Sequence, residues 1–141
     1  MNNNEANEVT INALDGIPDI KPGDDLCGMI LAAIDSNQYQ LDDGDILVIA
    51  HKVVSKQEGQ IIDLNDISPS DEALTLGKEL NKDPRKVQVV LSESKRLVRT
   101  SKRPSQDEGT IIAEHRLGFI CANAAVDESN VDAVGKVIIL P

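Results

Sequence analysis

Asp127, Ser129 and Asn130 bring a carboxylate, a hydroxyl and an amide together on one short segment. They follow residues 118–126, a run of apolar and small side chains that is typical of a buried strand. A polar loop that leaves such a strand can supply oxygen ligands to Mg²⁺ or Mn²⁺ and donors to a nucleotide. An ordinary Asp/Asn turn at a strand end fits the local sequence equally well. The loop is therefore a candidate metal and nucleotide site, with a plain turn as the alternative.

A second candidate group follows the aliphatic run at residues 46–50. Lys52, Ser55 and Lys56 place two ammonium groups and a hydroxyl at the expected exit of a buried strand, a combination that suits a triphosphate. The alternative is a solvated loop in which these side chains bind no ligand. Gly59 ends the segment and indicates a turn that needs an unusual φ.

The histidines and cysteines offer weaker signals. His51 and His115 are not spaced as metal ligands; His51 is a candidate nucleotide contact, whereas His115 indicates a surface turn between two short strands. Cys27 and Cys121 lie far apart in apolar contexts, which favours buried free thiols over a disulfide. The patterns GxGxxG and GxxxxGK[ST] do not occur, so neither a Rossmann fingerprint nor a P-loop is available.

Composition narrows the class of partner. The 141 residues carry 14 Lys and Arg against 24 Asp and Glu, for a net charge of −10, which argues against nucleic acid or an anionic membrane. The sequence has one tyrosine, Tyr39, one phenylalanine, Phe119, and no tryptophan, so a base-stacking platform is not expected. No apolar run approaches the roughly 20 residues that a membrane helix needs. We expect a cytoplasmic protein.

The elements that must position these side chains can be predicted from periodicity and turn signals. Helices are expected after Asp24, after Ser68 and after Asp83, where capping residues precede helical spacing of apolar side chains. Strands are expected at residues 9–11, 46–50, 61–62, 111–113, 117–120 and 137–140, with an exposed loop at 98–109. The run at 46–50 reads as a strand buried on both faces. The sequence predicts an α+β domain over residues 9–141, with a mixed sheet, about three helices and a disordered tail at 1–8.

Several motifs resemble those of one family. They are Ile17-Pro18-x-Ile20-x-x-Gly23-Asp24-Asp25-Leu26, Asp43-Gly44-Asp45-Ile46-Leu47-Val48, Lys52-Val53-Val54-Ser55-Lys56-x-Glu58-Gly59, Asp83-Pro84-Arg85, Leu91-x-Glu93-Ser94 and Gly118-Phe119-Ile120-Cys121-Ala122-Asn123-Ala124-Ala125-Val126-Asp127-x-Ser129-Asn130. In this order they resemble the N-terminal half of the coenzyme F-420-0:L-glutamate ligases (CofE and the N-terminal domain of FbiB). The resemblance covers about residues 9–141.

This resemblance implies a GTP-dependent γ-glutamyl ligase that acts on a deazaflavin coenzyme precursor. GTP would activate a carboxyl group as an acyl phosphate, and the amine of L-glutamate would displace phosphate, with Mg²⁺ or Mn²⁺ and K⁺ assisting. Metal and lysine would neutralise charge on the transferring phosphoryl group.

The resemblance also implies roles for individual residues, although it assigns no catalytic side chain. It places GTP contacts at Ile17, Pro18, Asp19, Ile20, His51, Lys52, Lys56 and Asn130, and a metal ligand at Asp127. His51 departs from the amide or hydroxyl expected there, and Ala125 stands where glycine is common.

The family's second half, which would supply further metal ligands, has no counterpart in this sequence. We therefore expect a ligase domain that works with a separate C-terminal half or as a homodimer. The alternative is a non-catalytic module that binds GTP and metal or only dimerises.

Overall fold

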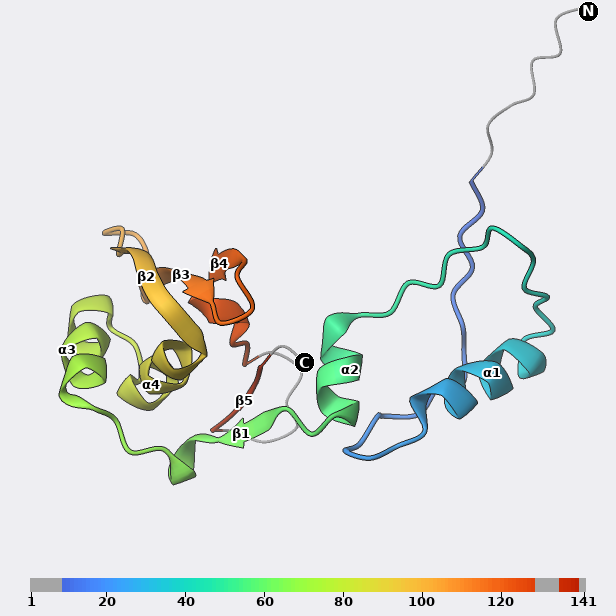
Figure 1. Ribbon diagram of the computed structural model, residues 1–141, viewed down its shortest axis with the longest axis horizontal. Coiled ribbons are helices and arrows are strands. Elements are labelled where there is room, and N and C mark those ends of the chain that lie inside the picture. The colour runs from blue at the N-terminus through green and yellow to red at the C-terminus, as the bar shows by residue number, and fades with distance from the viewer. Residues whose placement is uncertain (1–8, 129–134, 140–141) are drawn as a thin grey trace, which may run out of the picture.

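The computed structural model describes residues 9–128 and 135–139. Its elements are, in chain order, α1 (Leu26–Ser36), α2 (His51–Gln57), β1 (Ile61–Asp63), α3 (Asp71–Leu80), α4 (Pro84–Glu93), β2 (Ser94–Ser101), β3 (Thr110–His115), β4 (Ile120–Ala122) and β5 (Lys136–Ile138). The predicted α+β class is confirmed (Figure 1). The described strands form two antiparallel sheets where one mixed sheet was expected, and four α-helices where about three were expected.

The helices begin where local capping chemistry directs them. The Ser70 side chain accepts a hydrogen bond from the Ala73 N–H at 3.2 Å, and Asp83 accepts one from the Arg85 N–H at 2.9 Å ahead of Pro84. The start predicted at Asp83-Pro84 is confirmed, whereas the helix expected after Ser68 begins two residues later than predicted, with Ser70 as its cap. At α1 the cap is Asp25, which accepts from the Gly28 N–H at 3.0 Å. This is one residue later than predicted, because the Asp24 carboxylate accepts the Lys21 N–H instead, at 2.7 Å.

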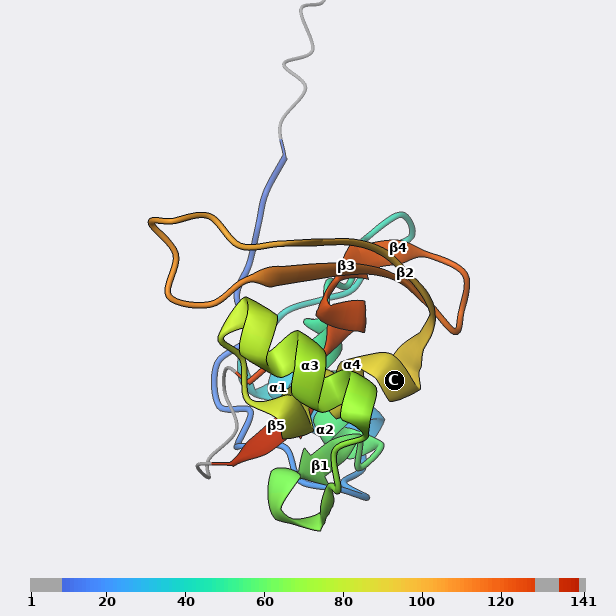
Figure 2. The same ribbon diagram turned by 90° about the vertical axis from the view of Figure 1, so that its left-hand side faces the viewer.

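The larger sheet has the strand order β2-β3-β4 and lies over α3 and α4 (Figure 2). Alternate residues of β3, namely Ile111, Ala113 and His115, are buried, because successive side chains of a strand point to opposite faces. The core beneath the sheet consists of Ala73, Leu80, Val87, Val90, Ile111, Ala113 and Ala124. The exposed loop expected at residues 98–109 is wrong at its start, because β2 continues to Ser101 paired with Thr110.

The smaller sheet pairs β1 with β5, placing Ile62 opposite Val137. It lies between α2 and the body made by α3, α4 and the larger sheet (Figure 1). A second buried cluster of Leu64, Val89, Val137 and Ile139 joins it to α4. Val126 packs against both clusters, so the chain just before Asp127 is held between the two sheets.

The predicted strand at residues 46–50 is wrong for this structure. The segment is extended but forms no strand, and Ile46 and Val48 are 86% and 87% exposed. The expected strand at residues 9–11 is also absent, and Val9 and Ile11 are exposed. Figure 1 shows the reason for 46–50: it runs alone between α1 and α2, with no described strand beside it. Among the described helices, none has both the length and the apolar character needed to cross a membrane.

Candidate functional site

Helix α2 carries both lysines of the candidate phosphate-binding segment. The segment is a helix from His51 to Gln57, with Lys52 in its first turn and Lys56 in its last, and not the solvated loop given as the alternative. Residues four apart lie on the same side of a helix, so both lysines share one face of α2. Ser55 is fully buried and its hydroxyl donates to the His51 carbonyl at 3.1 Å, so this hydroxyl is not available to a ligand.

Lys52 meets Asp127 across the fold. Its Nζ atom lies 2.5 Å from Asp127 Oδ2, and the two side chains are 22% and 38% exposed. The pair is therefore reachable from solvent yet partly shielded from it. The structure thus unites one residue from each of the two candidate groups that the sequence singled out.

Asp127 is positioned by an unusual turn. Asn123, Ala124 and Ala125 have φ values of 51°, 46° and 59°, so three successive residues with a Cβ atom adopt the left-handed region. Each such residue costs roughly 1–2 kcal/mol. Burial of Ala124 in the core and a hydrogen bond from the Val126 N–H to the Asn123 carbonyl at 2.9 Å hold the turn. Asp127 comes two residues after this turn, and its side chain contacts Lys52 of α2.

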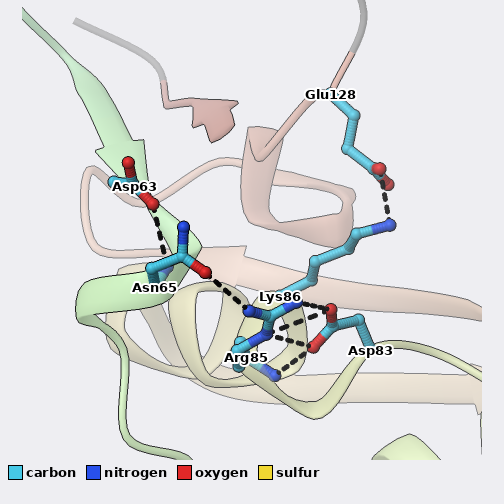
Figure 3. Close-up of polar contacts among 6 residues, drawn as sticks. All are labelled: Asp63, Asn65, Asp83, Arg85, Lys86 and Glu128. Atoms are coloured by element: carbon cyan, nitrogen blue, oxygen red, sulfur yellow. Dashed lines mark hydrogen bonds and ion pairs between the residues drawn. The ribbon is translucent and has the colours of Figure 1, made fainter. Parts of the chain in front are cut away.

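A second lysine, not singled out from the sequence, holds the residue after Asp127. Lys86 Nζ lies 2.5 Å from Glu128 Oε2, as Figure 3 shows. Lys86 belongs to the first turn of α4, whereas Lys52 comes from α2. Two consecutive carboxylates are therefore each paired with a lysine from a different helix. In the sequence, Lys86 could have been found only through its position directly after the Asp83-Pro84-Arg85 motif.

The start of α4 is itself tied to β1. Arg85 donates from Nε and Nη2 to the Asp83 carboxylate, with a shortest distance of 2.6 Å, and from Nη1 to Asn65 Oδ1 at 3.3 Å (Figure 3). The Asn65 N–H in turn donates to Asp63 Oδ1 at 2.9 Å. The hydrogen bond from Arg85 lowers the pKa of the Asp83 carboxyl and raises the pKa of Arg85. This network fixes the helix that carries Lys86.

The predicted nucleotide segment at residues 17–20 lies near the other end of α2. The Gly23 N–H, three residues beyond the segment, donates to the Gln57 carbonyl at 2.8 Å, which ties the chain just after the segment to the last turn of the helix. Ile20 is buried and Ile17 is half-buried, whereas Pro18 and Asp19 are exposed. The fold therefore places residues 17–20 toward the Lys56 end of α2 and Asp127 at the Lys52 end.

Three further predictions have different outcomes. His51 is exposed at the start of α2, and its role stays a prediction. Ser129 and Asn130 lie outside the described residues. Both cysteines are free as predicted, but Cys27 is exposed and Cys121 is only partly buried, so neither is the fully buried thiol expected.

The surface-turn interpretation of His115 is wrong. His115 is fully buried, and its ring stacks on Phe119 with ring centroids 4.7 Å apart. Its Nδ1 atom accepts the Leu117 N–H at 3.2 Å, and its Nε2 atom lies 3.3 Å from Glu93 Oε2 without hydrogen-bond geometry. The alternation of β3 places this residue on the core face, so it closes the end of the core.

Comparison with known proteins decides the family. The family model described as F420-0:Gamma-glutamyl ligase matches residues 16–141. The chain belongs to the F420-0:gamma-glutamyl ligase family. It is 42% identical over 124 residues to a coenzyme F420:L-glutamate ligase of Methanothermobacter thermautotrophicus, covering 88% of this chain and 47% of that relative. A ligase of the same name from Methanopyrus kandleri is 46% identical over 122 residues, covering 86% and 44%.

An Archaeoglobus fulgidus ligase of that name is 33% identical over 133 residues, covering 94% of this chain and 48% of the relative. The chain thus spans about half the length of the curated ligases that it matches. The resemblance read from the motifs is confirmed.

The donor set around Asp127 fits only part of a divalent metal site. Within residues 9–128 and 135–139, no group of three or more His, Cys, Asp or Glu side chains is arranged to hold a metal ion. Mg²⁺, however, is commonly held by one or two carboxylates, with waters and phosphate oxygens completing the octahedron. A partly exposed carboxylate beside a lysine meets that lesser requirement. Asp127 therefore has the chemistry of one metal ligand, and the other ligands of such a site would have to come from other groups.

Proposed function

We propose that this chain forms the part of a γ-glutamyl ligase that binds GTP and one divalent cation. We also propose that it works in the cytoplasm. The ligase joins L-glutamate to the deazaflavin coenzyme F-420-0. The observation that carries the proposal is the 2.5 Å approach of Lys52 to Asp127 within a chain of this family. An ammonium group beside a partly exposed carboxylate is a suitable arrangement for a metal-bound polyphosphate.

The proposed reaction has two steps. The γ-phosphoryl group of GTP passes to the carboxylate of the deazaflavin side chain, giving an acyl phosphate and GDP. The amine of L-glutamate then attacks the acyl carbon; the amide bond forms, the amine loses a proton and inorganic phosphate leaves. Activation is needed because a carboxylate does not react with an amine directly.

The residues of this chain have separate tasks in the proposal. Lys52 and Lys56, on one face of α2, bind the phosphates of GTP and neutralise charge on the transferring group. Asp127 would hold Mg²⁺ or Mn²⁺, which when bound would neutralise charge on the phosphates. Residues 17–20 contact the guanine nucleotide from the Lys56 end, with further contacts from His51 and Asn130. K⁺ also takes part.

A complementation assay tests the activity. A chimera would join this chain to the half of the Methanothermobacter thermautotrophicus ligase that it does not match. We expect GTP-dependent formation of a glutamyl amide on coenzyme F-420-0 in the presence of Mn²⁺, with release of GDP. Lys52→Ala and Asp127→Ala are expected to abolish it. Absence of product from the chimera, when the intact relative is active in the same assay, would overturn the proposal.

A second candidate is a module that binds GTP and metal without catalysis. It is favoured by the single candidate metal carboxylate among the described residues. Calorimetry separates the two. Binding of GTP and Mn²⁺ that depends on Lys56 and Asp127, in a chimera that forms no amide, would support the module.

A further inference from the structure

An uncovered apolar surface runs along α1 and the extended segment that precedes α2. Leu47 and Ile49 face α1 across a groove of about 510 Å³, which α1 lines with Leu26, Ile30, Leu31 and Ile34. The other two side chains of the segment, Ile46 and Val48, do not line this groove and are 86% and 87% exposed. Residues 46–49 thus alternate in two directions, as the residues of a sheet strand do.

The backbone of this segment also has no partner strand among the described residues. Within the part of the chain that the structure describes, residues 46–49 form no backbone hydrogen bond with another segment. An extended apolar segment with free N–H and C=O groups is a template for pairing with another strand. Exposed contiguous apolar patches of this kind mark interaction sites in soluble proteins. The surface therefore has the chemistry of a strand whose sheet lies outside these residues.

We propose that residues 46–50 are a sheet strand completed by the other half of the ligase, meaning the part that the curated relatives possess beyond the region matched here. A strand of that half pairs with the backbone of 46–50, and its apolar side chains cover Ile46 and Val48 and fill the α1 groove. This half can be joined to the chain or be a separate polypeptide. The proposal rests on family membership and does not depend on the proposed activity.

Two observations select this occupant over a second copy of the chain. The relatives contain about as much sequence again, since the matched region is 44–48% of their length. In addition, a strand with aliphatic side chains on both faces is typical of the interior of a sheet. Its backbone pairs along both edges and its side chains are covered on both faces. Two copies paired symmetrically through this segment would satisfy one edge of each strand, and a lone two-stranded ribbon is marginal in water. The other half of the ligase can supply a whole sheet.

Docking at this surface has a consequence for the candidate site. Residues 46–50 lead directly into α2, whose N-cap residue Ala50 makes no side-chain capping hydrogen bond. Fixing the strand therefore fixes the first turn of α2, which carries Lys52. The same contact that covers the apolar surface would thus hold Lys52 in place for its partner Asp127.

Hydrogen exchange tests this contact without any need for nucleotide or turnover. The probe is the unmatched half of the Methanothermobacter thermautotrophicus ligase, expressed separately and first shown to bind the matched half of its own chain. We expect its addition to slow exchange of the amides of residues 46–50 by roughly 100-fold, because these amides would become sheet-bonded. Failure to bind, or protection elsewhere that leaves 46–50 unchanged, would overturn the proposal.

A pair of variants gives a second measurement. Val48→Asp is expected to weaken binding of the probe by roughly tenfold or more, because a carboxylate would be buried in an apolar contact. Leu74→Asp is the matched control, since Leu74 is 50% exposed on α3, away from the groove, and binding should not change. Both free variants should keep the parent circular dichroism spectrum. Equal binding by the two variants, or protection of 46–50 in the chain alone through self-association, would refute the assigned occupant.

Discussion

Lys52 Nζ lies 2.5 Å from Asp127 Oδ2, and this contact joins α2 to the chain that follows β4. A divalent cation at Asp127 would compete with the ammonium group for the same carboxylate oxygen. Lys52 would then turn from the carboxylate to the phosphates that accompany the metal. Under the proposed function, the ion pair would therefore couple metal binding at Asp127 to the freedom of Lys52 to bind phosphate.

Asp127→Asn should weaken Mn²⁺ binding by about tenfold or more, because a neutral amide replaces the charged ligand and 1.4 kcal/mol corresponds to tenfold. Electron paramagnetic resonance of free Mn²⁺, with GTP present, measures the change. Asp43→Asn is the control, since Asp43 is an exposed carboxylate in the turn before residues 46–50. Equal Mn²⁺ affinity in the parent and Asp127→Asn would show that the metal ligand is misassigned.

Lys86→Ala should also weaken Mn²⁺ binding, by up to about tenfold, because Glu128 would no longer hold its neighbour Asp127 in position. Lys86→Arg keeps the charge and should restore much of the affinity. The melting temperature should change little, since a partly exposed ion pair contributes about 0–1 kcal/mol. A loss of affinity in Asp127→Asn together with none in Lys86→Ala would mean that Lys86 has no positioning role.

Ala125→Gly should stabilise the fold by roughly 0.5–1 kcal/mol, because relief of a left-handed residue outweighs the added backbone entropy of glycine in the unfolded chain. The residue has φ of 59°. Urea unfolding at neutral pH measures the difference. Ala32→Gly is the control, since Ala32 is an exposed residue inside α1, and it should destabilise by roughly 0.5–1 kcal/mol. A destabilised Ala125→Gly would show that the turn bears no strain at this position.

The Asp83–Arg85 pair should make the free energy of unfolding fall as the pH is lowered into the acid range. The pKa of the folded-state carboxyl lies below its ordinary value of 3.8, chiefly through the hydrogen bond from Arg85. Its stabilising contribution is therefore present above pH 3.8 and is lost as pH falls through that value and the lower folded pKa. Asp83→Asn, which keeps a good helix cap, should lose less stability than the parent between pH 6 and pH 2. Urea unfolding of both proteins at a series of pH values measures this. An equal fall in the free energy of unfolding between pH 6 and pH 2 would contradict the prediction.

Features governed by neighbours in the chain could be read from the sequence. The pair Asp83-Pro84 marked one helix start, and Ser68 marked another to within two residues, because a cap bonds to backbone groups two or three residues away. The candidate status of Asp127 also came from its own segment and from the family motif around it. His115 was misjudged for the converse reason: its polar neighbours suggested a turn, while the alternation of β3 placed it inside.

Contacts between distant segments could not be read in this way. The pairing of Lys52 with Asp127 and of Lys86 with Glu128 depends on how α2, α4 and the turn at Asn123–Ala125 pack, and no local pattern encodes that packing. Residues 46–50 illustrate the same limit. Their aliphatic side chains favour a buried strand, but a strand exists only when another segment accepts its hydrogen bonds. The amino-acid order thus established the family, the caps and the candidate residues, whereas three-dimensional packing established which of them meet.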